Sequence, residues 1–238
     1  MNIDIALLPK ETKEMNLSDR VCIVLDIFRA TTTIITALSN ECKEIIPVLS
    51  VEDAQALAKE IGPALLAGER QSIPIEGYHF GNSPFEFSKD KVKKQRIIMT
   101  TTNGTIAIKA TTGAYRTLIG SFLNAKAVCK QAKEEGKDIL IVCAGTDGYF
   151  SLEDSLCAGL LVKLLTREGV VEMSDSAHGA LLMYNMAQDT LLETAVQGRN
   201  GKRLYDLQRM ADVEYCLTMD TVEIVPEYKD GSICLTTL

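Results

Sequence analysis

Tryptophan is absent from this 238-residue chain, and histidine and proline are scarce, with two and six residues. The histidines, His79 and His178, lie far apart and in none of the short spacings that zinc sites use, so a histidine-based metal site is not expected. The seven cysteines are an odd number and show no CxxC spacing, which argues against a secreted disulfide scaffold. No cationic neighbour in the sequence would activate Cys143 or Cys157, so we expect buried, reduced thiols.

Long apolar segments and basic blocks are missing as well. Nowhere do enough apolar residues follow one another to span a bilayer, which argues against a membrane protein. The chain carries 25 basic and 32 acidic residues, a formal net charge of -7, and no basic cluster that would bind a nucleic-acid backbone. We therefore expect a cytoplasmic protein with neither nucleic acid nor a membrane as a partner.

The chain does contain enough apolar material for a substantial core. Hydrophobic residues make up 46% of the sequence, and its length allows one large α/β domain or two closely packed lobes. No long linker divides the sequence, so residues 1–238 are expected to form a single unit. A homodimer is a further expectation, since small α/β enzymes often form symmetric dimers.

The most informative stretch is VCIVLDIFRATTT, from Val21 to Thr33. Its first five residues are apolar and predict a strand covered on both faces, as in parallel α/β sheets. Asp26 follows where such strands end and ligands bind, and apolar residues at helical spacing from Ala30 to Leu38 predict a helix directly after Arg29. A carboxylate, a guanidinium and threonine hydroxyls thus gather near a helix N-terminus, which favours an anion. A helix cap with a salt-bridge partner is the structural alternative.

Strands and helices alternate in this way along most of the chain. The predicted strands are Val21–Leu25, Ile45–Leu49, Ala64–Ala67, Arg96–Thr100, Thr117–Ile119 and Asp138–Cys143. The predicted helices are Ala30–Leu38, Val51–Ile61 with Ser50 as its cap, one from Ile106, Ala125–Glu135 and one from Leu152. This alternation favours a three-layer α/β/α fold with a mostly parallel or mixed sheet and right-handed crossovers. The stretch from Thr221 to Leu238 predicts one or two closing strands around Pro226.

Several of these strands end in small polar residues. Glu69 and Arg70 again place a carboxylate beside a guanidinium, although a solvated surface pair explains such a case equally well. The run TTNGT at residues 101–105 offers hydroxyls, an amide and a glycine that suit an oxyanion, yet tight strand-to-helix turns use the same residues. Residues 120–124 suit a helix cap, and Asn124 is the member that we expect to be functional.

Two further segments are candidates for the same site. The polar stretch from Gln71 to Lys91 predicts an ordered functional loop, because a structureless loop of that length is uncommon. It also offers a route by which His79 could reach the site. Glu153 and Asp154 begin a helix, so they either complement its dipole or take part in metal binding or water activation.

Taken together, these motifs resemble the 2-phosphosulfolactate phosphatases, magnesium-dependent enzymes associated with coenzyme M biosynthesis. The resemblance rests on DIFRATTT (Asp26–Thr33), AGER (Ala67–Arg70), GNSP (Gly81–Pro84), TTTNGT (Thr100–Thr105), GSFLNA (Gly120–Ala125), VCAG (Val142–Gly145) and LEDSLCAG (Leu152–Gly159). The set in this order is more specific than any one motif. It covers most of residues 21–159, and the chain beyond Thr166 carries fewer signatures.

The resemblance implies hydrolysis of the phosphate monoester of 2-phosphosulfolactate, a small anionic substrate, with Mg²⁺ as cofactor. It implies Asp26, Arg29 and Asp154 as catalytic residues and Asp26 and Glu69 as metal ligands. The substrate-binding residues would be Arg70, Asn82, Ser83, Thr102, Asn103, Gly104, Thr105 and Asn124. This assignment is chemically sound, because magnesium takes oxygen ligands and arginine forks bind phosphate or sulfonate.

The role of Asp26 divides two mechanisms. In phosphatases of the haloacid-dehalogenase type the nucleophilic aspartate begins a DxDx(T/V) motif, and Phe28 stands here where the second aspartate belongs. We therefore expect Asp26 to ligate a metal that activates water, with an aspartyl-phosphate intermediate as the alternative. Two other functions also stay open. One is a phosphatase of another small anionic hydroxyacid phosphate, and the other is a non-catalytic anion-binding protein.

Overall fold

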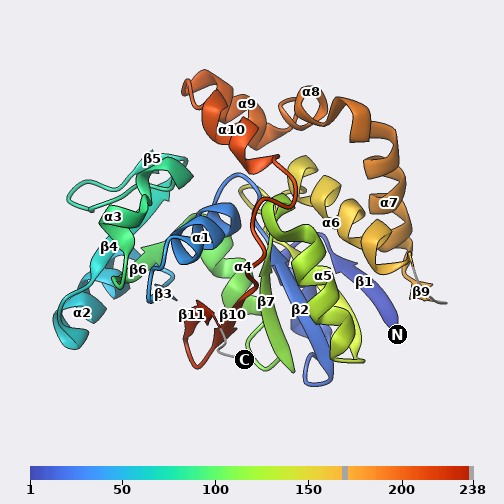
Figure 1. Cartoon of the computed structure of the whole chain (residues 1–238), viewed down its shortest axis with the longest axis horizontal. Helices are drawn as coiled ribbons and strands as arrows, with labels where there is room; N and C mark the ends of the chain where they lie inside the picture. The colour runs from blue at the N-terminus through green and yellow to red at the C-terminus, as the bar shows by residue number, and fades with distance from the viewer. Residues whose placement is uncertain (168–170, 236–238) are drawn as a thin grey trace.

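The computed structural model describes residues 1–167 and 171–235. Within these residues one mixed sheet has the strand order β5-β4-β6-β3-β11-β10-β7-β2-β8-β1-β9 (Figure 1). Its strands are β1 (Asn2–Ala6), β2 (Arg20–Leu25), β3 (Glu44–Pro47), β4 (Leu65–Arg70), β5 (Ile73–Pro74), β6 (Arg96–Thr100), β7 (Arg116–Gly120), β8 (Asp138–Cys143), β9 (Glu172–Met173), β10 (Pro226–Lys229) and β11 (Ser232–Leu235).

Helices cover both faces of this sheet, which confirms the predicted three-layer α/β/α fold. The α-helices are α1 (Ala30–Ser39), α2 (Val51–Ile61), α3 (Lys89–Val92), α4 (Gly104–Ala110), α5 (Ala125–Glu134), α6 (Leu152–Leu165), α7 (Asp175–Ala187), α8 (Leu191–Ala195), α9 (Arg199–Asp206) and α10 (Met210–Cys216). Short 3-10 helices are η1 (Pro9–Glu14), η2 (Pro84–Glu86), η3 (Phe122–Asn124) and η4 (Gln188–Thr190).

Strand β2 shows how the continuous apolar run serves two cores. Val21, Ile23 and Leu25 belong to a core that includes residues of α5, α6 and α7. Cys22 and Val24 point to the other face and belong to a core that includes residues of α1 and α4. Because successive side chains of a strand alternate between faces, five apolar residues in a row bury this strand on both sides, as predicted.

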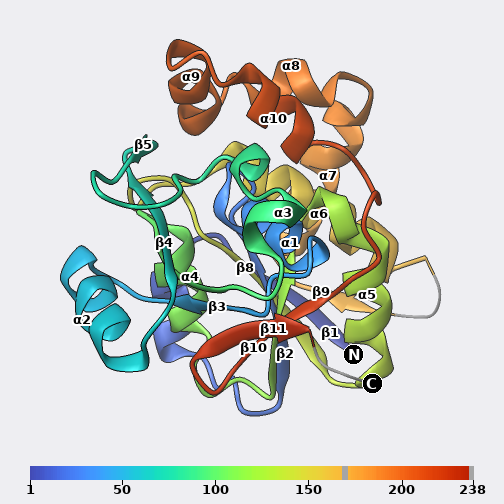
Figure 2. The same cartoon turned by 60° about the vertical axis from the view of Figure 1, so that its left-hand side comes forward.

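A hairpin from late in the chain lies in the middle of the sheet (Figure 2). Strands β10 and β11 pair with each other in antiparallel fashion, β10 pairs antiparallel with β7, and β11 pairs antiparallel with β3. They thereby join one parallel block, β4-β6-β3, to another, β7-β2-β8-β1-β9. Pro226 is the first residue of β10, a strand position that tolerates the missing N–H. The predicted range for closing strands also includes residues 236–238, which lie outside the described residues.

Several element bounds differ from those predicted. Strand β4 continues to Arg70, because Glu69 and Arg70 pair with the short strand β5. Helix α4 begins two residues early, at Gly104. The cap of α2 is as predicted, since Ser50 Oγ accepts a hydrogen bond of 2.9 Å from a backbone N–H of the first turn. Strand β1 and the helices from α7 to α10 carry no motif and were not predicted.

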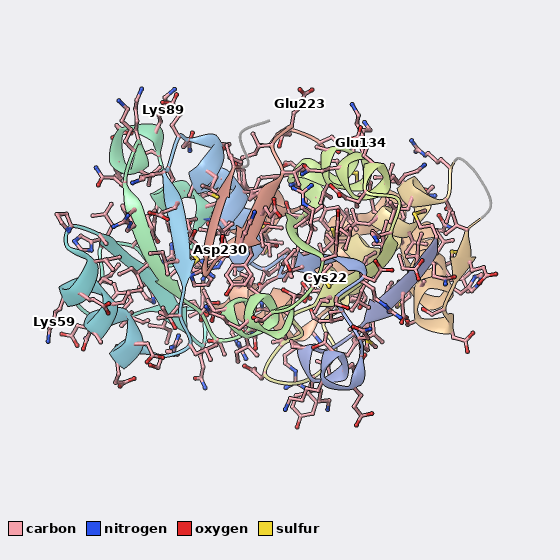
Figure 3. All side chains as sticks on the ribbon, turned by 90° about the horizontal axis from the view of Figure 1, so that it is seen from below. Cys22, Lys59, Lys89, Glu134, Glu223 and Asp230 are labelled. Carbon is pink, nitrogen blue, oxygen red and sulfur yellow. The ribbon has the colours of Figure 1, made fainter. Side chains whose placement is uncertain are left out.

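Most charged side chains lie on the outside of the molecule, and the cysteines lie mainly within it. Figure 3 shows Lys59, Lys89 and Glu134 at the periphery, whereas Cys22 lies inside on β2. All seven cysteines are free, and six of them are buried, as expected for reduced thiols. Among the described helices, none combines the length and apolar character that a membrane span requires.

Candidate active site

A small pocket lies where β2, β4 and β6 end, beside helix α9. Its lining combines Glu69 near the end of β4 with residues from the loops after these strands and two residues of α9. Figures 1 and 2 show α9 and α10 above the strand ends. The lining residues are Asp26, Phe28, Arg29, Glu69, Ser72, Asn82, Thr102, Asn103, Asn200 and Arg203. The structure thus brings together six of the residues singled out in the sequence, which come from four separate motifs.

Asp26 is buried at the centre of this site, with 7% of its surface exposed. Its Oδ1 accepts a hydrogen bond of 3.2 Å from the backbone N–H of Ala30. The pKa of Asp26 is raised to about 7, mainly by burial and also by the charges of Glu69 and Glu153, while the Ala30 N–H and Arg29 act in the opposite direction. Near neutral pH this carboxyl group is therefore balanced between its protonated and ionised forms, so a bound cation would displace its proton.

Gly104 allows the loop after β6 to approach Asp26 closely. A Cβ atom at this position would lie 2.7 Å from Asp26 Oδ2 and 2.5 Å from the Cβ of Ala30. The next residue, Thr105, is buried and closes the turn, since its N–H donates to Thr101 Oγ1 at 3.1 Å and its hydroxyl to the Thr101 carbonyl at 3.0 Å. Neither of these two predicted substrate-binding residues lines the pocket, and both instead shape the turn beside Asp26.

Glu69 ties two loops together at the pocket wall. Its Oε1 accepts from the Thr102 N–H at 2.7 Å, and its Oε2 accepts from the Ser72 N–H at 2.5 Å and from Thr102 Oγ1 at 3.1 Å. A carboxylate offers about four acceptor positions, so these contacts leave capacity for a cation. The Glu69 carboxylate therefore connects the turn between β4 and β5 to the turn after β6.

Arg29 is locked by a buried ion pair with Asp212 of α10. Its Nη1 donates to Asp212 Oδ2 at 2.6 Å, and its Nη2 donates to the Ser72 carbonyl at 3.3 Å. Ser83 donates through Oγ to the other carboxylate oxygen of Asp212 at 2.7 Å. The predicted residue Ser83 therefore acts on the pocket through Asp212, which the sequence analysis missed.

Asp154 lies behind the pocket and does not line it. Its two carboxylate oxygens accept from the N–H groups of Ile27, at 2.8 Å, and Gly145, at 3.1 Å, so it joins the loop after β2 to the loop after β8. Burial raises its pKa well above the ordinary value, and the charges of Glu153 and Asp26 act in the same direction. Asp154 therefore positions the loop that contains Asp26 and does not itself face the pocket.

Three buried side-chain oxygens around the site have no hydrogen-bond partner in the described part of the chain. They are Asn82 Oδ1, Glu153 Oε2 and Asn200 Oδ1. Such unpartnered groups are rare in proteins, and hard cations such as Mg²⁺ bind through oxygen. Within residues 1–167 and 171–235 no three or more His, Cys, Asp or Glu side chains are arranged to hold a metal, so the site offers no closed cage.

Arg70 points away from the pocket, although its neighbour Glu69 lines it. Its guanidinium donates to the Glu69 carbonyl at 2.8 Å, to Thr100 Oγ1 at 2.9 Å and to the Leu49 carbonyl at 3.3 Å. Residues that alternate along β4 point to opposite sides, so only one of the two can face the site. Arg70 therefore connects β4 to β6 and to the loop that follows β3.

The side chain of Asn124 also makes hydrogen bonds to backbone groups of the protein. Its Oδ1 accepts from the Ser121 N–H at 3.0 Å, and its Nδ2 donates to the carbonyls of Ile119, at 3.1 Å, and Ile224, at 3.0 Å. It forms a capping box with Ser121, which matches the structural alternative for this segment. His79 does not line the pocket either, because its Nδ1 accepts from a backbone N–H of β4 at 2.9 Å.

The site residues from α9 and α10 were missed by the sequence analysis. They are Asn200, Arg203 and Asp212, of which Asn200 donates through Nδ2 to the carbonyl of Phe28. The segment GRNG at residues 198–201 is the one local signal, and small polar runs of this kind are too common to identify a site. Their role depends on how the helices fold back over the strand ends.

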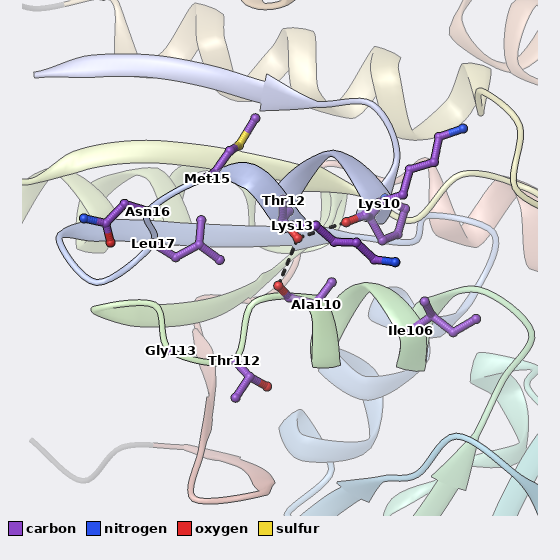
Figure 4. A pocket seen from close by; sticks show the side chains of 11 residues that line it. Lys10, Thr12, Lys13, Met15, Asn16, Leu17, Ile106, Ala110, Thr112 and Gly113 are labelled. Atoms are coloured by element: carbon purple, nitrogen blue, oxygen red, sulfur yellow. Dashed lines mark hydrogen bonds between the residues drawn. The ribbon is translucent and has the colours of Figure 1, made fainter.

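Another pocket lies between η1 and α4 and contains none of the predicted site residues (Figure 4). Lys10 and Lys13 lie beside it, and Ile106 and Ala110 come from α4. Thr12 joins the two elements, because its hydroxyl donates to the Ala110 carbonyl at 3.1 Å. This pocket lacks the buried carboxylates that distinguish the site around Asp26.

Comparison with known proteins agrees with the motifs. The chain matches the family described as "2-phosphosulpholactate phosphatase" over residues 6–231. It is 41% identical over 235 residues to a "Probable 2-phosphosulfolactate phosphatase" of Clostridium acetobutylicum, an alignment that covers 98% of this chain and 100% of the relative. It is 40% identical to the protein of the same name from Clostridium tetani, with coverage of 98% and 100%, and 40% identical to that of Caldanaerobacter subterraneus, with 92% of each chain covered. This chain belongs to the 2-phosphosulfolactate phosphatase family.

Proposed function

We propose that this protein is a Mg²⁺-dependent phosphatase that hydrolyses 2-phosphosulfolactate to sulfolactate and inorganic phosphate. The substrate is supported by family membership over nearly the whole chain and by the names of the relatives. The dependence on magnesium is supported by one observation above all, the unpartnered buried amide oxygens of Asn82 and Asn200, which line the pocket together with Asp26.

The carboxylates around the pocket would repel a phosphate unless a cation is bound between them. Asp26 and Glu69 line the pocket, and the positive charge of Arg29 is already matched by Asp212 at 2.6 Å. A phosphate dianion would therefore meet mainly carboxylates. Because Mg²⁺ keeps several waters and needs only one or two carboxylates, Asp26 and Glu69 with the amide oxygen of Asn82 fit it without a closed cage. When bound, magnesium would supply charge neutralisation for the phosphoryl oxygens.

The protein's own residues would hold and orient the reacting groups. In the reaction a water oxygen forms a bond to phosphorus, the ester P–O bond breaks, and the hydroxyl of sulfolactate takes up a proton. Arg29 can orient a phosphoryl oxygen at little entropic cost, because Asp212 already immobilises its guanidinium. Asp26, with a pKa of about 7, releases its proton when a cation approaches. Thr102 and Asn103 line the wall formed by the loop after β6.

The test is phosphate release from 2-phosphosulfolactate with magnesium or with a chelator. We expect turnover with magnesium, loss of turnover with the chelator, and loss of magnesium-dependent turnover in Asp26→Asn with the circular dichroism spectrum unchanged. Asp189→Asn, which removes an exposed carboxylate on η4, serves as the matched control. Near-normal turnover by Asp26→Asn would contradict the proposal. Hydrolysis of 2-phospholactate or phosphoglycerate alone would indicate another hydroxyacid phosphate, and binding without release would indicate an anion-binding protein.

A further inference from the structure

Two guanidinium groups line the pocket, and their surroundings differ. Arg29 is 4% exposed, and both of its terminal nitrogens donate to the protein. Arg203 of α9 is 25% exposed and donates through Nη2 to the Asp147 carboxylate. In the part of the chain that the structure describes, this is the one hydrogen bond of the Arg203 guanidinium, so four of its five N–H donors are available to a ligand.

The partner of Arg203 is held in a fixed place. Asp147 and Gly148 have φ values of 56° and 78°, the pattern of a two-residue turn with both central residues in the left-handed region. Backbone hydrogen bonds of 2.9 and 3.1 Å between the flanking residues close this turn. The Asp147 N–H also donates to Asn103 Oδ1 at 3.1 Å, which ties the turn to the loop after β6.

Helix α9 is docked over this turn by two arginines one helical turn apart. Arg199 and Arg203 lie on the same face of the helix, four residues apart. The guanidinium of Arg199 lies 4.6 Å from the centroid of the Tyr149 ring, and that of Arg203 meets Asp147. The guanidinium of Arg203 is therefore held on the α9 side of the pocket by contacts on two sides, and its charge also acts on the buried carboxylate of Glu153.

We propose that Arg203 binds the anionic group of the substrate that is not cleaved, and so selects substrates that carry a second anion. This inference rests on the proposed function, in which the phosphate is held near Asp26 and the rest of the molecule carries a carboxylate and a sulfonate. Either group offers oxygens to a guanidinium fork, which binds such planar or threefold anions better than an ammonium group. Asp147 sets the plane of the guanidinium, and the free N–H groups receive the ligand.

The test compares Arg203→Met and Arg203→Lys with Lys202→Met, which removes an exposed positive charge from the same helix outside the pocket. In the magnesium-loaded protein we expect Arg203→Met to weaken binding of sulfolactate by about 10- to 100-fold, measured by calorimetry, and to raise KM by a similar factor with kcat within about twofold. Inorganic phosphate, which lacks the second anion, should bind as tightly as to the wild type. Arg203→Lys should recover part of the loss, and Lys202→Met should match the wild type.

Competition by lactate and by 2-hydroxypropane-1-sulfonate then identifies the group. If Arg203→Met weakens inhibition by lactate, Arg203 binds the carboxylate of the substrate. If it weakens inhibition by 2-hydroxypropane-1-sulfonate, Arg203 binds the sulfonate. Equal losses for sulfolactate and inorganic phosphate, or unchanged binding of sulfolactate, would overturn the assignment of Arg203 while the phosphatase activity stands. A wild-type protein that neither binds sulfolactate nor releases phosphate from its ester would overturn the proposed function together with this inference.

Discussion

Replacement of Asp26 by asparagine should stabilise the metal-free protein at alkaline pH. The pKa of Asp26 is raised from an ordinary 3.8 to about 7, mainly by burial. A carboxyl group with a raised native pKa favours the folded state most below the unfolded pKa, and that contribution is lost as pH rises through the native pKa. The amide is neutral at every pH and can keep the hydrogen bond from the Ala30 N–H.

The size of the effect follows from the two pKa values. Each pH unit between them costs the wild-type folded state about 1.4 kcal/mol, so Asp26→Asn should be more stable by about 1.5 kcal/mol at about pH 5 and by about 4 kcal/mol at about pH 8. For a chain of this size the larger difference corresponds to a rise in Tm of roughly 10 °C. Some pH dependence remains in the variant, because burial also raises the pKa values of Glu153 and Asp154.

The assay is guanidinium-induced unfolding at several pH values in the presence of a chelator. Asp189→Asn should follow the wild type at each pH, since that carboxylate is exposed. Added magnesium should then raise the stability of the wild type at about pH 8 and leave Asp26→Asn unchanged, because a ligand stabilises only the state that binds it. Unfolding free energies of wild type and Asp26→Asn that change in parallel from about pH 5 to about pH 8 would refute the reasoning.

Two further substitutions test the shape of the site. Gly104→Ala should lower kcat/KM by about 100-fold, because the added Cβ would lie 2.7 Å from Asp26 Oδ2. Gly179→Ala serves as the control and should leave steady-state kinetics unchanged, because its Cβ meets nothing within 4 Å. Equal kinetics for the two variants would contradict the packing argument. Asn124→Ala should lower the free energy of unfolding by about 1 to 3 kcal/mol, because it leaves buried backbone groups unpaired, with KM unchanged. Urea unfolding and steady-state kinetics would show the reverse pattern if Asn124 bound the substrate.

The strand-tip pattern predicted part of the site because it depends on local sequence. An apolar run that ends in a polar residue marks the carboxyl edge of a parallel sheet, and this rule led to Asp26, Glu69 and the turn at residues 101–105. It did not distinguish residues that face the pocket from those that face away. Arg70 and Asn124 have the right chemistry, but strand alternation turns the first aside and a capping box engages the second.

The contribution of the helical layer could not be predicted for a different reason. Asn200, Arg203 and Asp212 reach the pocket because α9 and α10 fold back over strands that precede them by about a hundred residues or more. Helical periodicity indicates which face of a helix is apolar, but it does not indicate which loops of the protein the helix will contact. The same limit applies to the hairpin of β10 and β11, since a strand pattern does not give the order of strands in a sheet.

The central place of that hairpin bears on how the protein is made. Asp26 follows a strand of one parallel block, whereas Glu69 lies near the end of β4 and Thr102 follows β6 in the other block. Within the described sheet the two blocks are hydrogen-bonded to each other through residues 226–235. A ribosome synthesises both blocks well before this hairpin. Until the hairpin emerges, the growing chain has two unpaired sheet edges, on β3 and β7, which are surfaces for wrong pairing and for chaperones. The final sheet, and with it the alignment of the two halves of the pocket, therefore requires residues 226–235 and is completed late in synthesis.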